Sequence, residues 1–189
     1  MKLIGIGGTN GSGKDTVARI LAEEHGFLAV SVSDLLRAEC ERRGLPVERE
    51  NLRMISAEWR REGGLGVLVD KAVEEFERQG GVHAGLAVGS LRNPGEVDRV
   101  HELGGTVVWV DADPRVRYER IMAADRCRAG EDNVTYEEFI AQEEAEMSQS
   151  GDAATLNMGA VRAGADVELL NSAGRAEIEA QLSAIVVSQ

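Results

Sequence analysis

The sequence predicts an α/β fold in which a five-stranded parallel sheet is covered by helices on both faces. Two observations predict it: short runs rich in Val, Ile and Leu recur along the chain, and longer stretches of helical periodicity separate them. The short runs are apolar on both faces, which is typical of strands buried inside a parallel sheet. The expected strands are residues 3–6, 27–32, 86–88, 106–110 and 166–170.

Helical periodicity fills the segments between and after these strands. Ligands of such sheets bind at the carboxyl ends of the strands, so the residues that follow each strand are the first candidates for a functional site. The expected helices are residues 14–24, 34–43, 48–62, 65–78, 94–103, 114–122, 136–147 and 175–187.

Length and composition indicate one compact domain, residues 1–189, with 43% hydrophobic and 29% charged residues. No apolar run approaches the length of a membrane span and the N-terminus lacks a signal-peptide pattern, so we expect a cytoplasmic protein without a membrane partner. The net charge of −12 disfavours nucleic acid, whose phosphates require clustered basic residues. A small phosphorylated ligand remains compatible with this charge if the basic residues gather in one cleft.

A glycine-rich loop follows the first expected strand and leads directly into the first expected helix. Glycines let successive backbone N–H groups converge on phosphate oxygens, the helix N-terminus adds positive potential, and Lys14 would reach the outer phosphates. This arrangement predicts a nucleoside triphosphate site, and a GTPase is disfavoured because the sequence has no Asn-Lys-x-Asp segment. The expected nucleotide-binding residues are Gly8, Asn10, Gly11, Ser12, Gly13, Lys14, Asp15 and Thr16.

The strict form of this motif has Ser or Thr directly after the lysine, whereas this chain has Asp15 there and Thr16 one position later. In this departure the sequence resembles the nucleoside monophosphate kinase superfamily, particularly its adenylate-kinase-like and dephospho-CoA-kinase-like members. The resemblance covers nearly the whole chain and implies a three-layer P-loop kinase fold with ATP and Mg²⁺ as cofactors. It also implies an acceptor-binding insertion at about 34–80 and a short lid at about 123–135.

The segment 31–37, SVSDLLR, resembles the Gly-Asp-x-Leu-Arg segment of that superfamily. The resemblance implies that Arg37 binds the acceptor phosphate and that Asp34 lies near the metal. On local grounds alone, Ser33 or Asp34 is expected to cap the following helix, and Arg37 could equally be a solvated helical charge.

The segment 86–94, LAVGSLRNP, is similar to an apolar strand that in the superfamily is followed by Asp-Gly-x-Arg. Arg92 matches the second acceptor-binding arginine, so Arg37 and Arg92 together would clamp one dianionic group. Arg92 could also be a plain loop arginine before the helix that Pro94 starts. Gly89 stands where the superfamily keeps an aspartate, so the usual strand-end carboxylate for magnesium is missing.

Arginines follow the fourth expected strand, and Arg120, Arg126 and Arg128 resemble the lid arginines that close over transferring phosphates. Asp113 before Pro114 is expected to cap the next helix, while the role of Asp111 stays open. Near the C-terminus, Asn171 lies in a segment that resembles the turn lying against the nucleotide base in that superfamily. A plain strand-to-helix turn explains this segment almost as well.

The resemblance implies direct in-line transfer of the γ-phosphoryl group of ATP to a small anionic acceptor, without a covalent intermediate. The sequence does not decide whether the acceptor is a nucleoside monophosphate or dephospho-CoA. Because Gly89 replaces the usual aspartate, the chain could also be a regulatory nucleotide-binding module without efficient catalysis. A monomer or small homo-oligomer is expected. The expected catalytic residues are Lys14, Asp34, Arg92, Arg120, Arg126 and Arg128.

Magnesium needs oxygen ligands, and three residues are expected to replace the missing aspartate. Asp15, Asp34 and the Thr16 hydroxyl would hold the ion mostly through its water shell, because Mg²⁺ gives up water reluctantly. The alternative is that Asp15 only stabilises the first turn of its helix, where the N-terminal potential favours a carboxylate.

Overall fold

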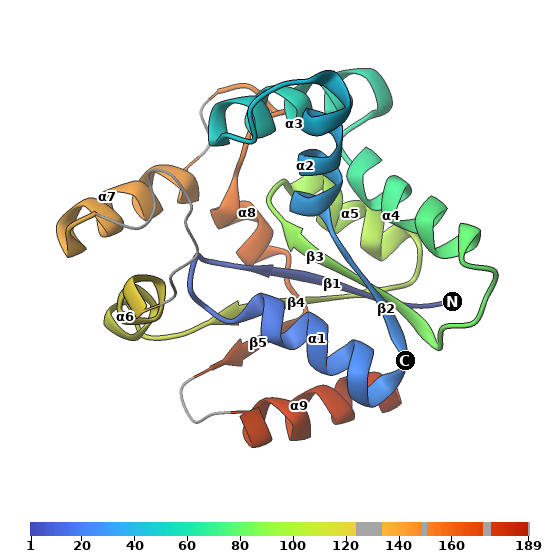
Figure 1. Ribbon diagram of the computed structural model, residues 1–189. Coiled ribbons are helices and arrows are strands. Elements are labelled where there is room, and N and C mark those ends of the chain that lie inside the picture. The colour runs from blue at the N-terminus through green and yellow to red at the C-terminus, as the bar shows by residue number, and fades with distance from the viewer. Residues whose placement is uncertain (124–133, 149–150, 172–174, 189) are drawn as a thin grey trace.

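The computed structural model describes residues 1–123, 134–148, 151–171 and 175–188. Within them the strands form one parallel sheet in the order β2-β3-β1-β4-β5, which confirms the predicted five-stranded parallel sheet (Figure 1). The strands are β1 (Lys2–Gly8), β2 (Phe27–Ser31), β3 (Gly85–Leu91), β4 (Thr106–Asp111) and β5 (Val167–Leu170).

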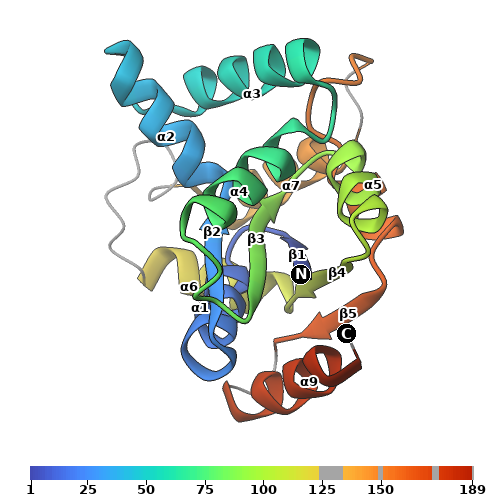
Figure 2. The same ribbon diagram turned by 90° about the vertical axis from the view of Figure 1, so that its right-hand side faces the viewer.

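Helices cover both faces of the sheet, as predicted (Figure 2). One face packs against α1 and α9, and the other packs against α4, α5 and α8. The helices are α1 (Lys14–His25), α2 (Val32–Arg43), α3 (Arg49–Gly63), α4 (Val67–Arg78), α5 (Pro94–Glu102), α6 (Pro114–Ala123), α7 (Tyr136–Met147), α8 (Met158–Ala163) and α9 (Arg175–Ser188).

The pleat of β1 divides the core into two layers. Ile4 and Ile6 pack with Val108 on the side of α1 and α9, whereas Leu3 packs on the opposite side. On that opposite side a Cβ at Gly5 would lie 2.8 Å from the Leu91 side chain, so a residue without a side chain is needed there. The two layers fix β1, and with it the loop that follows β1.

Helices α2 and α3 pack on each other and project beyond the sheet in both views (Figures 1 and 2). They occupy the region for which the sequence predicts an acceptor-binding insertion. An ion-pair network joins them: Arg43 of α2 contacts Glu39 at 2.7 Å and donates two hydrogen bonds of 2.7 and 2.8 Å to Glu58 of α3.

Two local predictions differ from the structure. Helix α2 begins at Val32, so its N-cap is Ser31, and the prediction that Ser33 or Asp34 caps it was wrong. The helix starts directly at the end of β2, which leaves both residues inside its first turn. Helix α8 was not predicted, because its six residues are too short for a periodic pattern.

The expected cap of α6 is confirmed. Asp113 Oδ1 accepts hydrogen bonds from the backbone N–H groups of Arg115 at 2.9 Å and Val116 at 3.4 Å, and Pro114 begins the helix. None of the helices in the described ranges is long and apolar enough to cross a membrane.

Candidate active site

The loop between β1 and α1 has a backbone that only glycine accommodates at several positions. Gly11 has a φ of 76° and Gly13 a φ of 95°, both in the left-handed region. A Cβ at Gly11 would lie 2.6 Å from the Arg117 carbonyl oxygen, and one at Gly13 would collide with the Asn171 side-chain amide. The glycines expected to form a phosphate-binding loop are therefore required by this geometry.

Two hydroxyls of this loop are buried without a hydrogen-bond partner among the described residues. They are Thr9 Oγ1 and Ser12 Oγ, whose residues are 7% and 0% exposed. An unpaired buried hydroxyl is costly, and such groups in proteins commonly serve a ligand. Both hydroxyls lie in the loop that precedes α1, whose N-terminus adds positive potential for an anion.

A hollow of about 350 Å³ opens where the loop meets α1, and we call it the loop pocket. Glycines of the loop, residues of α1, α6 and α9, and the residue after β5 line it. The lining residues are Gly11, Gly13, Lys14, Asp15, Thr16, Arg120, Asn171, Arg175 and Ile178.

Arg120 extends from α6 into the wall of the loop pocket. Its Nη2 donates to the Asn171 carbonyl oxygen at 3.0 Å, whereas its Nη1 is buried and has no partner in the described part of the chain. A guanidinium with one buried N–H group left unpaired, in the same hollow as Lys14, fits an anionic ligand.

Asn171 holds the loop between β1 and α1 through a side-chain hydrogen bond. Its Nδ2 donates to the Ser12 carbonyl oxygen at 2.8 Å, and its backbone N–H donates to the Asp111 carbonyl oxygen at 2.7 Å. The side chain is therefore occupied with holding the loop, a role that the sequence did not suggest. Its predicted contact with a nucleotide base stays a prediction.

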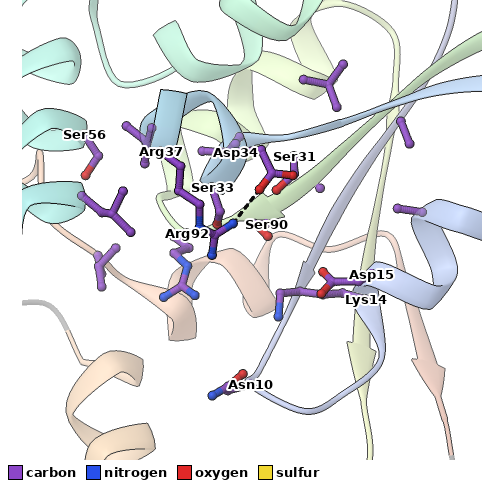
Figure 3. A pocket seen from close by; sticks show the side chains of 18 of the residues that line it. Asn10, Lys14, Asp15, Ser31, Ser33, Asp34, Arg37, Ser56, Ser90 and Arg92 are labelled. Atoms are coloured by element: carbon purple, nitrogen blue, oxygen red, sulfur yellow. Dashed lines mark hydrogen bonds and ion pairs between the residues drawn. The ribbon is translucent and has the colours of Figure 1, made fainter. Parts of the chain in front are cut away.

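A larger cavity of about 530 Å³ lies between the loop, the end of β3 and helices α2 and α3, and we call it the arginine pocket (Figure 3). Six arginines line it against three acidic side chains. In a chain of net charge −12, this is the cleft in which basic residues gather, as a phosphorylated ligand requires. The charged lining residues are Arg19, Arg37, Arg49, Arg53, Arg60, Arg92, Lys14, Asp15, Asp34 and Glu146.

The two pockets meet at the start of α1. Lys14 and Asp15 line both the loop pocket and the arginine pocket. A group bound at the loop and a group bound among the arginines would thus both lie close to the Lys14 side chain.

Arg37 and Arg92, which the sequence predicts to bind the acceptor, both line the arginine pocket, and Figure 3 shows both guanidinium groups pointing into it. Each is paired with a carboxylate of the chain itself. Arg37 Nη1 lies 2.5 Å from Asp34 Oδ1, and Arg92 Nη1 lies 3.6 Å from Glu146 Oε2. An incoming anion would compete with these two carboxylates.

The expected magnesium residues are distributed over both pockets. Thr16 lines the loop pocket, Asp34 lines the arginine pocket and is 71% exposed, and Asp15 lines both. Among the described residues no three His, Cys, Asp or Glu side chains gather into a metal site. The donor set therefore fits Mg²⁺ only as an ion that phosphate oxygens and water hold for the most part.

Gly89 lies within β3, two residues before the strand ends, in the wall of the arginine pocket. A Cβ at this position would meet nothing closer than the Val30 carbonyl oxygen at 3.8 Å. The aspartate that the superfamily keeps here would therefore fit, and its absence is not forced by packing.

Sequence reasoning missed several pocket residues. Arg49, Arg53 and Arg60 lie on α3 and Glu146 on α7, where charged residues at helical spacing look like a solvated surface. The sequence did contain a signal for Glu96, the partner of Arg60. Asn93 followed three residues later by Glu96 is the pattern of a capping box, and the two residues form one at the start of α5. Arg126 and Arg128, expected in the lid, lie outside the described residues.

The sheet order, the helices on both faces and the glycine loop between β1 and α1 define a P-loop kinase fold. Solved structures agree with this class. Shikimate kinase from Bacteroides thetaiotaomicron superposes with a TM-score of 0.62 at 15% identity, covering 99% of this chain and 98% of that one. TT1252 from Thermus thermophilus superposes with a TM-score of 0.57 at 21% identity, covering 98% and 96%.

Sequence comparison gives the family. A family model described as an AAA domain matches residues 4–146. A UPF0200 protein of Thermococcus kodakarensis is 30% identical, covering 96% of this chain and 94% of its own, and one of Hyperthermus butylicus is 33% identical, covering 95% and 90%. The chain belongs to this AAA-domain family and to the UPF0200 proteins.

Proposed function

We propose that this protein is an ATP-dependent phosphotransferase that moves the γ-phosphoryl group to a small phosphorylated acceptor, with a nucleoside monophosphate as the favoured class. One observation carries the proposal: Lys14 and Asp15 line both the loop pocket and the arginine pocket. A donor on the loop and an acceptor among the arginines would bring the two reacting groups together beside Lys14.

The chemistry in this arrangement is direct transfer. An oxygen of the acceptor forms the new bond to the γ-phosphorus while the bond to the β-phosphate oxygen breaks, and ADP leaves. The loop N–H groups, Lys14 and Arg120 hold the donor phosphates, and Arg37 and Arg92 hold the acceptor. Mg²⁺, when bound with ATP, would neutralise charge on the outer phosphates, and Asp15, Asp34 and Thr16 are the residues we propose to hold its water shell.

Two arginines aimed into one pocket favour a monophosphate as the acceptor group. Dephospho-CoA is the second candidate, because a kinase that phosphorylates a ribose hydroxyl needs a carboxylate near it, and Asp34 lines the arginine pocket. Gly89 motivates a third candidate, a nucleotide-binding regulatory module that has lost efficient catalysis.

A coupled assay of ADP release separates these candidates. The full chain is given ATP and Mg²⁺ with each of a panel of nucleoside monophosphates or with dephospho-CoA. We expect ADP release that depends on one nucleoside monophosphate class. Release with dephospho-CoA alone would favour the second candidate, and ATP binding without acceptor-dependent ADP release would favour the regulatory module.

A further inference from the structure

Glu146 stands out among the pocket residues because three arginines surround its carboxylate. Arg53 Nη2 lies 3.2 Å from Oε1, Arg49 Nη1 lies 3.8 Å from Oε1, and Arg92 Nη1 lies 3.6 Å from Oε2. The Glu146 side chain is 19% exposed. The arginines come from two separate elements, α3 and the loop after β3, and converge on one point.

These contacts are loose compared with those of a neighbouring glutamate on the same helix. Glu143 of α7 accepts two hydrogen bonds of 2.6 and 2.8 Å from the buried Arg117. That bidentate pair is a tight structural link between α6 and α7. Glu146 forms no comparable bidentate pair among the described contacts, although three guanidinium groups are within reach.

Arginines gather around Glu146. In the described part of the chain, the guanidinium groups of Arg49, Arg53 and Arg92 all face this one carboxylate, in a cleft of an acidic protein. Converging arginines in a concave site attract a ligand anion, and a carboxylate in their midst occupies the position that such an anion would take.

The surroundings of Glu146 leave room for a ligand. Arg49, Arg53 and Glu146 line the arginine pocket and also a neighbouring hollow of about 420 Å³ between α3 and α7. Ser56 lines both spaces as well. The carboxylate therefore stands at the junction of two connected spaces, where an acceptor extending beyond Arg37 and Arg92 would pass.

We propose that Arg49 and Arg53, together with Arg92, form a second anion-binding subsite of the acceptor pocket, and that Glu146 fills this subsite until an acceptor replaces it. The ligand is a second anionic group of the acceptor, a phosphate or a carboxylate, separate from the group at Arg37. This inference rests on the proposed function and narrows it: it favours an acceptor with a second anionic group over a nucleoside monophosphate, which has a single phosphate, and Glu146 is an internal competitor for that second group.

Calorimetric titration of the full chain without nucleotide tests the subsite. Inorganic phosphate and malonate are the two probes, and the one that gains more affinity identifies the anionic group. We expect Glu146→Gln to bind the preferred probe about tenfold more tightly than the wild type, because a competing charge about 4 Å from the anion is removed. Glu144→Gln is the matched control: Glu144 is an exposed residue of the same helix and lines none of these spaces.

Two further variants locate the bound anion. In Glu146→Gln/Arg53→Gln the gain should disappear, and in Glu146→Gln/Lys14→Ala it should remain, because the proposal places the preferred probe among the arginines and not on the loop. Arg53→Gln alone should weaken binding of the probe, which keeps the test valid if melting shows that Glu146→Gln does not fold.

Three outcomes would contradict the proposed subsite. An equal gain in Glu144→Gln, a gain that survives Arg53→Gln but not Lys14→Ala, or no binding of either probe at millimolar concentration would each overturn the subsite. Because the titration uses neither ATP nor turnover, a failure of the proposed kinase activity would leave this result readable by itself.

Discussion

Arg60, which lines the arginine pocket, forms an ion pair of 2.7 Å with Glu96, and their side chains are only 2% and 0% exposed. The second Glu96 oxygen accepts the backbone N–H groups of Arg92 at 2.7 Å and Asn93 at 3.1 Å. Arg60 also donates to the Ala154 carbonyl oxygen at 2.9 Å. The pair thus joins α3 to the loop that carries Arg92, and it positions that arginine.

Removing the charge of Glu96 should destabilise the fold. In Glu96→Gln the Arg60 guanidinium remains buried without a counter-charge, so we expect the free energy of unfolding to fall by about 3–5 kcal/mol. Urea unfolding measures it. Glu102→Gln, at the exposed end of the same helix, removes a surface partner of Arg99 and should cost less than about 1 kcal/mol. Equal losses in the two variants would show that the buried pair has no special role.

The two acceptor arginines should act on the acceptor alone. Arg37→Ala and Arg92→Ala are each expected to weaken acceptor binding by about tenfold or more, since a charge-assisted hydrogen bond is lost, while ATP affinity stays nearly unchanged. Calorimetry with each ligand measures both effects. Arg78→Ala, on the exposed end of α4, is the control. If ATP binding suffered and acceptor affinity stayed intact, the assignment of Arg37 and Arg92 would be wrong.

Asp15 should set the magnesium requirement. Asp15→Asn is expected to raise the Mg²⁺ concentration for half-maximal turnover, while metal-free nucleotide binding stays intact or improves, because a charge facing phosphate is removed. A Mg²⁺ titration of turnover measures the first effect. An unchanged requirement would remove Asp15 from the metal site.

The matching gain-of-function variant is Gly89→Asp. The backbone there has room for a Cβ, so the variant should fold, and a carboxylate at the end of β3 should increase turnover if the chain is an impaired kinase. No turnover in either form would favour the regulatory module.

The ion pairs of Glu39 with Arg42 and Arg43, within α2, should weaken in acid. The Arg42 hydrogen bond, with a further hydrogen bond from Arg43, lowers the pKa of Glu39 from its ordinary 4.5 to about 2, against the opposing effect of burial. Because the folded-state pKa is depressed, this stabilisation is complete above pH 4.5 and is lost as the pH falls toward 2. Urea unfolding of the wild type and Glu39→Gln should therefore differ most above pH 4.5 and converge below it. A constant difference over this window would contradict the linkage.

The sheet and the phosphate loop could be predicted because their signals are local. Buried parallel strands read as apolar runs, and the glycines around Lys14 precede a helix directly. The pairing of Arg60 with Glu96 could not be predicted, because it joins α3 to α5 across the fold, and a charged residue on a helix gives no local sign of burial. The same holds for Glu146, whose three arginine neighbours lie far from it in sequence.

The start of α2 was misplaced for a different reason. Ser33 and Asp34 have good capping chemistry, but the cap position is set by where β2 ends in the sheet. Asp34 pairs with Arg37 one turn later. The end of β2, and not the capping preference of Ser33 or Asp34, therefore decides where α2 begins.

The donor site at Lys14 underlies every other assignment, and thermal unfolding of Lys14→Ala with ATP and Mg²⁺ tests it. A ligand that binds only the folded state raises the melting temperature by mass action, so the wild type should gain a shift that Lys14→Ala loses. Lys71→Ala is the control, because Lys71 of α4 packs over the Trp59 ring of α3 and lines neither pocket. We expect Lys71→Ala to keep the wild-type shift and Lys14→Ala to show none; a full shift in Lys14→Ala would contradict binding of the nucleotide phosphates at this loop.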